Sequence, residues 1–290
     1  MTVADPIETR RDLSPDRPAW LRLPRFARIP TSLALAWLII AIAAAWSLAP
    51  DLFTAYSGTA GLALQHRLPP GGVHWLGTDE LGRDVLARII FGSVHTLSGA
   101  FVAVGVGLVA GTLLGLIAGS AGRLADDIIM RMVDVLLAVP ALLLSLSIII
   151  LLGFGTINAA IAVGVSSVAS FARLARSEVA RVRTADYVEA AFGSGGSVLA
   201  VLWRHVLPNA LTPVMALAAL QFGSAILSIS TLGFLGYGAQ PPMPEWGLMI
   251  AEGRRYIATA WWMSIFPGVA VVIVVLATNR ISLSLRGRPD

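Results

Sequence analysis

Residues 96–119 read TLSGAFVAVGVGLVAGTLLGLIAG, an apolar run without a charged side chain. An α-helix rises about 1.5 Å per residue, so a run of this length crosses a hydrocarbon layer of about 30 Å. Its glycines at 107, 111, 115 and 119 recur every four residues and therefore share one face of the helix. Small residues let a second helix backbone approach closely within a membrane. We expect this face to pack statically against a neighbouring helix, with a sliding contact as the alternative.

Five further apolar runs have a comparable length, near residues 32–49, 130–152, 157–175, 209–235 and 259–282. The chain of 290 residues is 56% hydrophobic and 13% charged, with a mean hydropathy of +0.77, which excludes a soluble domain. Strands of a membrane barrel would give short alternating segments, whereas helices satisfy every backbone group within a long apolar run. The sequence therefore predicts an all-α, polytopic membrane protein with six transmembrane helices.

The basic residues are all arginine, 21 of them, and the chain has neither lysine nor cysteine. A Walker phosphate-binding loop requires a lysine, so this chain cannot form one. Without cysteine, a disulfide framework and a thiolate metal site are also excluded. We therefore expect any nucleotide hydrolysis that drives the protein to occur in another subunit. The arginines border apolar runs instead of forming a basic stripe, so nucleic acid is not an expected partner.

The arginine distribution predicts how the spans are oriented. If the N-terminus lies inside, the arginines concentrate in the tails and inner loops, and the outer side receives only those at 67, 83, 88, 254 and 255. This asymmetry follows the positive-inside rule and predicts that both termini are cytoplasmic. The first apolar run is longer than a usual signal-peptide core of about 7–15 residues, so we expect an uncleaved first helix.

These features divide the chain into four parts. We expect a cytoplasmic tail at 1–31, the first transmembrane helix with an extracytoplasmic loop at 32–95, a core of five transmembrane helices at 96–282, and a cytoplasmic tail at 283–290. Within the core, residues 177–208 form the longest predicted cytoplasmic loop. This loop is the polar interruption of an otherwise apolar region.

The third run begins among charged residues. Arg131 and Asp134 are three residues apart, so they can pair on one helical face near the membrane edge. We expect a structural ion pair here, with a role in coupling as the alternative, because a paired interfacial charge needs no transport function. Pro140 follows and should kink this helix by removing one backbone hydrogen bond.

The first outer loop carries four potential metal ligands, His66, His74, Asp79 and Asp84. Imidazole and carboxylate together suit a divalent transition metal, although the spacing matches no recognised motif. We expect a folded loop in which these residues make turns and helix caps, so no metal site is assigned. A membrane metalloenzyme is the alternative. In the second outer loop, 236–247, we expect an exposed Trp246 that faces a partner protein or the lipid headgroups.

The spans contain almost no titratable side chains. Gln221 is the main large polar residue of the fifth run, and no series of Asp, Glu or His residues crosses the bilayer. Ion-driven carriers use such groups near the middle of the membrane. A secondary carrier is therefore a less favoured alternative.

The segment 186–208, DYVEAAFGSGGSVLAVLWRHVLP, has the pattern of two short helices joined by a bend. Asp186 and Glu189 have the spacing of a capping box, and the glycines at 193, 195 and 196 interrupt the helical pattern. Pro208 should end the second helix before the fifth span begins, which places this helix along the membrane surface. Two alanines beside Glu189 leave a shallow surface that a partner protein can approach.

Several motifs carry a family resemblance. Glu189–Ala–Ala–x–x–x–Gly195 followed by Leu207–Pro208 resembles the EAA loop of permease subunits of bacterial ABC importers. The segments 74–84, 126–140, 232–238 and 240–247 are similar to the second, or C-type, permease of the dipeptide, oligopeptide and nickel group. The resemblance extends from the first span to about residue 279.

The resemblance implies a heteromeric importer of the bacterial cytoplasmic membrane with the architecture of a type I permease. Its expected partners are a similar permease, two ATPase subunits that bind ATP and Mg, an extracytoplasmic binding protein and membrane lipid. This chain would itself be non-catalytic and hold no cofactor. Peptides are the expected cargo, with nickel or another small solute as the alternative, and no substrate-binding residue is assigned. The residues expected to couple transport to the ATPases are Glu189, Ala190, Ala191, Gly195, Leu207 and Pro208.

Overall fold

The computed structural model describes residues 30–62 and 64–285, and this part of the chain is helical with a single isolated β-bridge between Thr78 and Asp84. The helices, in chain order, are α1 (Thr31–Leu48), the 3₁₀ turn η2 (Pro50–Leu52), α2 (Val85–Ser120), α3 (Arg123–Ala138), α4 (Ala141–Leu152), α5 (Thr156–Arg183), α6 (Asp186–Gly193), α7 (Val198–Val201), the π-helical turn η3 (Leu202–Val206), α8 (Leu207–Phe234), α9 (Trp246–Arg254) and α10 (Trp262–Leu285). The predicted all-α class is confirmed.

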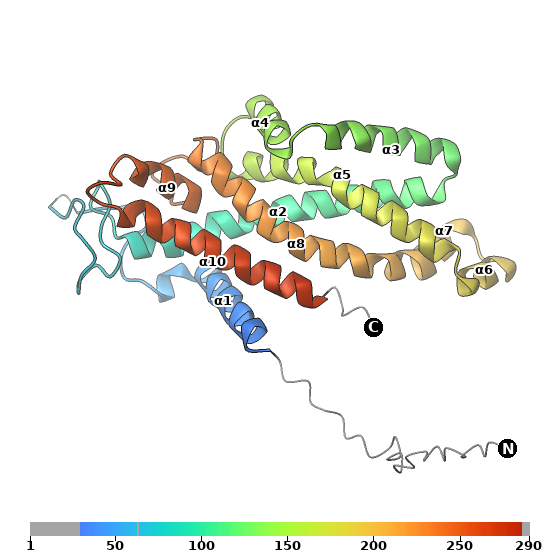
Figure 1. Cartoon of the computed structure of the whole chain (residues 1–290), viewed down its shortest axis with the longest axis horizontal. Helices are drawn as coiled ribbons and strands as arrows, with labels where there is room; N and C mark the ends of the chain where they lie inside the picture. Colours follow the sequence, from blue (N-terminus) through green and yellow to red (C-terminus); the bar gives the residue numbers. More distant parts are fainter. Residues whose placement is uncertain (1–29, 63, 286–290) are drawn as a thin grey trace, which may run out of the picture.

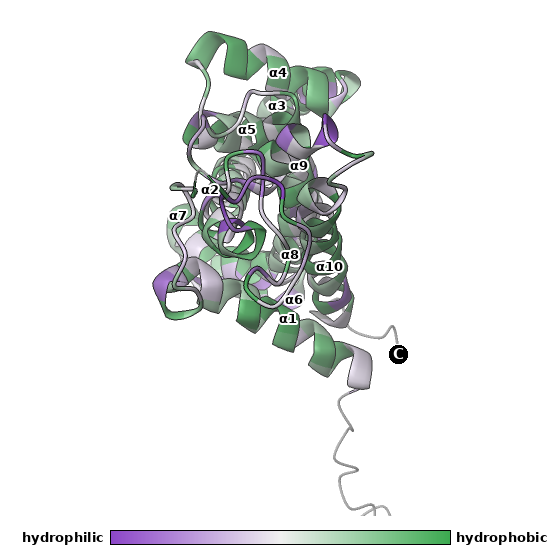
Figure 2. Cartoon of the chain, turned by 90° about the vertical axis from the view of Figure 1, so that its left-hand side faces the viewer, coloured by the Kyte–Doolittle hydropathy of each residue, from purple (hydrophilic) through white to green (hydrophobic). Residues whose placement is uncertain are grey.

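The long helices lie side by side along the longest axis of the molecule (Figure 1). Helices α2, α5, α8 and α10 form the bundle, α1 lies against α10 and α2, and α3 lies along α5. The short helices α6 and α7 gather at one end, here called the α6 end. The loop that follows α1 and helix α9 gather at the opposite end, the α9 end. Figure 2 views the bundle from the α9 end and shows that α1 and α4 consist mostly of hydrophobic residues.

The centre of the bundle is the contact between α2 and α5. A Cβ atom added at Gly111 would lie 2.4 Å from the Cβ of Phe171 and 2.6 Å from the carbonyl oxygen of Val168. Gly164 of α5 is equally close to α2, because its Cβ would lie 2.8 Å from the carbonyl oxygen of Ala103. The glycine face expected from the sequence therefore meets α5, and both backbones approach each other as they do at small-residue contacts in membranes.

Five helices are long and apolar enough to cross a membrane, and the count reaches six if the bent pair α3 and α4 forms one span. The third span was predicted over 130–152 with a kink at Pro140: the bend lies there, but the chain forms two helices instead of one kinked helix. The chain turns by 95° between α3 and α4. Val139 has an extended backbone (φ −88°, ψ 129°) because the ring of Pro140 disfavours the helical conformation in the preceding residue.

Two further helix limits differ from the prediction. Helix α2 begins at Val85 instead of residue 96, since the carboxylate of Asp84 accepts a hydrogen bond from the amide of Ala87 and caps the helix. Pro208 does not end a helix, because α7, η3 and α8 follow one another without a break. A π-helical turn at Leu202–Val206 precedes the proline, and the amide of Leu207 donates to the carbonyl oxygen of Leu202. The chain continues as a helix past Pro208, although this residue has no N–H to donate.

Most of the expected tails lies outside the described residues. This holds for 1–29 of the N-terminal tail and for 286–290 of the C-terminal tail, and α10 continues to Leu285.

Candidate functional site

The loop between α5 and α8 forms the tip of the α6 end. It follows the predicted order of a short helix, a bend and a second helix, but the second helix joins α8 instead of lying along the membrane surface. Val188 of α6 is fully buried and packs with Val182 of α5 and with Val201 and Val206 of the second helix. This small apolar cluster fixes α6 by one face and leaves its other face in solvent.

The expected coupling residues lie at different depths in this loop. Glu189 and Ala190 are exposed on α6, while Ala191 packs against the apolar cluster. Gly195 follows α6 with a positive φ of 85°, the left-handed conformation that glycine adopts readily at the end of a helix. Leu207 is partly buried in the same cluster, whereas Pro208 is exposed at the start of α8.

The capping box predicted at the start of α6 is absent. Ala185 occupies the N-cap position and makes no side-chain hydrogen bond, while Asp186 and Glu189 both lie within the first turn. Their negative charges are still favourable there, because the exposed amides of a helix N-terminus attract anions.

Large apolar side chains also lie on the exposed surface of this loop. Tyr187, Leu199 and Trp203 are 48%, 67% and 55% exposed. Leu199 and Trp203 are four residues apart, a spacing that places them on one helical face and that the sequence already contains. An exposed apolar surface of this kind indicates a site that another protein or the membrane covers.

Ion pairs and hydrogen bonds fix the α6 end to the bundle. Arg183, at the end of α5, donates to the carbonyl oxygens of Gly119 and Ser120 at 2.9 and 3.0 Å. A cation is favourable at this place because the last carbonyl groups of α2 carry partial negative charge. The loop that follows Arg183 is therefore tied directly to the end of α2.

Two ion pairs join α3 to α5. Arg173 contacts Asp134 at 2.5 Å, and the Nε atom of Arg176 donates to Asp126 at 2.9 Å. The predicted pair between Arg131 and Asp134 is wrong. Asp134 turns toward α5 instead of along its own helix, because an arginine of the neighbouring helix lies within reach.

Two adjoining cavities lie between α3, α4, α5 and α8. The first has a volume of about 340 Å³ and lies at the break between α3 and α4, and the second has a volume of about 820 Å³ and lies nearer the α6 end. Leu137 and Ser170 line both, so the two cavities form one groove, here called the α5/α8 groove. Its hydroxyl and amide side chains are Ser166, Ser167, Ser170, Ser177, Thr212, Gln221, Ser224 and Ser228.

The polar residues of the α5/α8 groove follow the helical repeat. On α5 they occur at 166, 167, 170, 173 and 177, and on α8 at 212, 221, 224 and 228. Most of these positions are three or four residues apart and therefore share one face of their helix. Arg173 is the one charged side chain among the described residues that line the groove. Serines that are spread along the sequence therefore lie together in one groove, which carries a single charged side chain among its described lining residues.

The four candidate metal ligands make separate contacts at the α9 end. The Nδ1 atom of His74 lies 2.8 Å from Asp84, and the Nδ1 atom of His66 lies 2.9 Å from the carbonyl oxygen of Glu80. Asp79 pairs with Arg83 and Arg88. Within residues 30–62 and 64–285, no three such side chains are placed to hold a metal ion. These residues shape the loop and cap α2.

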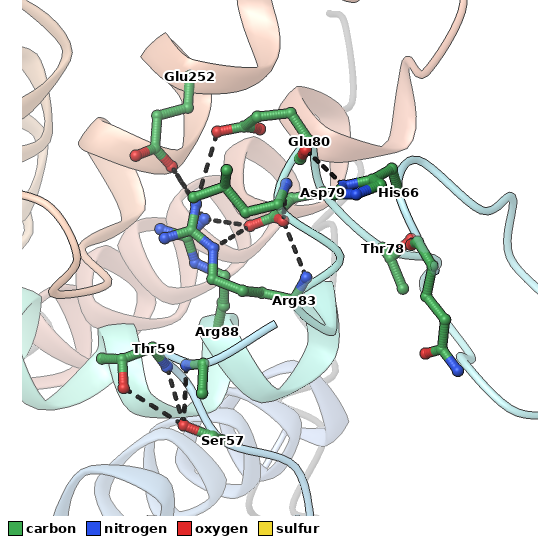
Figure 3. A network of polar contacts seen from close by, with 12 residues as sticks. Ser57, Thr59, His66, Thr78, Asp79, Glu80, Arg83, Arg88 and Glu252 are labelled. Atoms are coloured by element: carbon green, nitrogen blue, oxygen red, sulfur yellow. Dashed lines mark hydrogen bonds and ion pairs between the residues drawn. The ribbon is translucent and has the colours of Figure 1, made fainter. Parts of the chain in front are cut away.

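A buried charge network joins the loop to α2 and α9 (Figure 3). The Nε atom of Arg83 donates to Asp79 at 2.6 Å, and Arg88 of α2 lies 2.9 Å from Glu252 of α9. Both arginines are 1% exposed. Buried charges are tolerated only when they are paired, so this network holds the loop and α9 in fixed positions. Sequence reasoning did not find Glu252, which is distant from Asp79 along the chain.

Glu245 caps α9 from inside the protein. Its carboxylate is fully buried and accepts hydrogen bonds from the amides of Gly247 and Leu248 at 2.8 and 2.9 Å. The neighbouring Trp246 was predicted to be exposed, which is wrong. It is 1% exposed, and its ring N–H donates to the carbonyl oxygen of Ile89 at 2.9 Å, because the cap turns the indole toward α2.

We expect Glu245 to make stability depend on pH. Burial raises the pKa of Glu245 to about 7, against 4.5 for an ordinary glutamate. Between these values the folded protein holds a proton that the unfolded chain releases, so the contribution of Glu245 to stability is greatest below the lower pKa and is lost as the pH rises through about 7. The full difference is about 3 kcal/mol, at ~1.4 kcal/mol for each pH unit between the two pKa values.

Thermal denaturation of the purified wild-type protein and of Glu245→Gln, measured in detergent between about pH 5 and about pH 8, checks this expectation. The wild type should lose more stability than the variant as the pH rises. An identical pH dependence in both proteins would contradict it.

A bundle of membrane-spanning helices with a polar groove between its spans is an architecture typical of membrane transport proteins. Residues 111–288 match the family of binding-protein-dependent transport system inner membrane components. The chain belongs to this family and is a multi-pass permease subunit of an ABC importer, without catalytic activity of its own.

Similar proteins include the dipeptide transport permease DppC of Alkalihalophilus pseudofirmus, 44% identical over 76% of this chain and 73% of the relative. The glutathione transport permease GsiD of Pectobacterium atrosepticum is 40% identical over 76% of this chain and 73% of that protein. Among solved structures, the MetNI methionine ABC transporter in an inward facing conformation matches with a TM-score of 0.54 at 19% identity, covering 70% of this chain and 97% of that chain. This likeness places the fold among type I importer permeases.

Proposed function

We propose that this chain works with a similar permease, two ATPase subunits and an extracytoplasmic binding protein to import peptides by alternating access. The α6 end and both termini face the cytoplasm, and the α9 end receives the binding protein. Closure of the ATPases on ATP changes the position of α6, and the rigid helices carry this motion to the α5/α8 groove. ATP and Mg bind to the ATPase subunits, since this chain has no lysine for a phosphate-binding loop.

The exposed face of α6 carries this proposal. Glu189 and Ala190 lie in solvent beside Tyr187, and the buried contacts of Val188 connect the same helix to α5. A force applied to α6 therefore reaches α5, one wall of the groove. Arg183 adds a second connection, to the end of α2.

The groove also favours peptides over nickel as the cargo. Its lining, among the described residues, contains hydroxyl and amide groups and one arginine but no histidine, cysteine or carboxylate. Nickel prefers imidazole and other strongly donating ligands, whereas peptides are rich in hydrogen-bond donors and acceptors. Relatives are named for dipeptide, di/tripeptide and glutathione transport, and glutathione is itself a peptide.

The experiment that tests this function is reconstitution. Affinity purification of the tagged chain from its source cells should recover a second permease and ATPase subunits. In proteoliposomes with the binding protein, uptake of a labelled peptide should require ATP and should not respond to a proton or sodium gradient. Uptake by this chain alone under an ion gradient would instead establish a secondary carrier.

A further inference from the structure

Gln221 lies at the middle of α8, in the wall of the α5/α8 groove. The side chain is half-buried and makes no hydrogen bond to another described residue. Its nitrogen and oxygen are not among the buried side-chain atoms that lack a hydrogen-bond partner, so the carboxamide is open to the groove. Within a membrane such a group is tolerated where it faces water or a ligand, so its position at the centre of a spanning helix indicates a function.

The side chains near Gln221 are of the same kind. Ser170 lies across the cavity on α5, while Ser224 lies beside Gln221 on α8, and neither is hydrogen-bonded to another described residue. Ser166 donates to the carbonyl oxygen of Val163 at 2.7 Å, which leaves the lone pairs of its oxygen free to accept from the groove. The cavity thus presents free donors and acceptors from both of its walls.

The chemistry of this cavity matches the peptide group. A glutamine carboxamide offers N–H donors and a carbonyl acceptor, so it can donate to a backbone C=O and accept from a backbone N–H of a peptide. The first cavity, of about 340 Å³, has no charged side chain among its lining residues, and Arg173 enters only nearer the α6 end. A neutral surface discriminates little between acidic and basic peptide side chains, because it neither attracts nor repels them.

We propose that Gln221, together with Ser170 and Ser224, binds the backbone amide of the cargo peptide halfway across the membrane. This inference rests on the function proposed above. The site recognises what all peptides share, so selection among peptides lies with the binding protein.

Uptake of labelled dialanine by the reconstituted complex tests this inference, with Gln221→Leu compared with the wild type. Leucine keeps a similar volume and removes the hydrogen bonds, so uptake should fall about tenfold, the scale of one or two lost hydrogen bonds. The matched control is Thr231→Val, since Thr231 is exposed on the same helix, donates to the carbonyl oxygen of Leu227 and lines neither cavity. Its uptake should equal that of the wild type.

The absence of cysteine permits a second measurement that does not depend on transport. A single cysteine at Gln221 should react with a charged thiol reagent from water, and dialanine supplied with the binding protein should slow the reaction. A cysteine at Leu227, which is 46% exposed on another face of α8, should not react.

The outcomes separate the two proposals. Wild-type uptake by Gln221→Leu, or a cysteine at 221 as unreactive as one at 227, would overturn the amide-binding site and leave the importer assignment intact. Absence of ATP-dependent dialanine uptake by the wild-type complex would overturn the proposed cargo and the site with it.

Discussion

Replacing Glu189 by lysine is expected to lower peptide uptake about 100-fold while the protein still inserts and assembles. The side chain is exposed and makes no ion pair with another described residue, so its loss disturbs few contacts within the chain. Reversing its charge in the first turn of α6 costs the helix about 0.3–1 kcal/mol through the helix dipole. Where a glutamate pairs with a cation across a protein interface, replacing it by lysine leaves that cation unpaired, which costs about 2–5 kcal/mol.

Uptake and ATPase activity of reconstituted complexes measure this effect, and the amount of assembled complex is determined by co-purification. Glu189→Asp is the matched control, since it keeps the negative charge at the same exposed position of α6 and should retain most of the uptake. Glu189→Gln should give an intermediate loss. Normal transport by Glu189→Lys at normal expression would show that α6 does not couple the permease to an ATPase.

Replacing Gly115 by alanine is expected to destabilise the bundle by about 3 kcal/mol, near the upper end for overpacking. The added Cβ would lie 2.5 Å from the Cβ of Ala175 and 2.7 Å from both the carbonyl oxygen of Ala172 and the amide nitrogen of Arg176. Two of these atoms belong to the backbone of α5, so no side chain can rotate to relieve the contact. Helices α2 and α5 must therefore move apart, and this weakens the most extensive helix–helix contact of the bundle.

The melting temperature in detergent should therefore fall by about 6–12 °C. Gly105→Ala is the control because Gly105 lies on the same helix and its added Cβ would meet no atom within 4 Å. Alanine favours a helix over glycine by about 1 kcal/mol, so this variant should be as stable as the wild type or slightly more stable. Equal melting temperatures for the two variants would mean that α2 and α5 do not pack as closely as described.

The α6 end shows which features of a loop a sequence pattern can predict and which it cannot. The helix, bend and helix of 186–208 follow from local preferences of alanine, glycine and proline, and this order is present. The capping box was wrong because the helix begins after Ala185, and the surface helix was wrong because the chain continues as a helix past Pro208. Both errors concern where a helix begins or ends, which depends on backbone geometry that residue types alone do not fix.

The groove could be predicted only in part. Gln221 stands out in the sequence as a large polar side chain within a span, but its neighbours on α5 are far away in the chain. Similarly, the partner of Asp134 is Arg173 and not the nearer Arg131. Such pairings arise where two helices touch, and they depend on which faces meet.

The sequence by itself determined that this protein is a bundle of membrane helices with a polar loop between two apolar runs and without a lysine for a Walker phosphate-binding loop. Apolar length, glycine spacing and the missing lysine are properties of single segments, so they can be read without knowing what lies beside them. Only the tertiary structure decided that Trp246 is buried, that α3 and α4 separate at Pro140, and that hydroxyls from α5 and α8 meet Gln221 in one groove. These features depend on contacts between segments that are distant in the chain. Such contacts contribute free energy only after the helices have packed together.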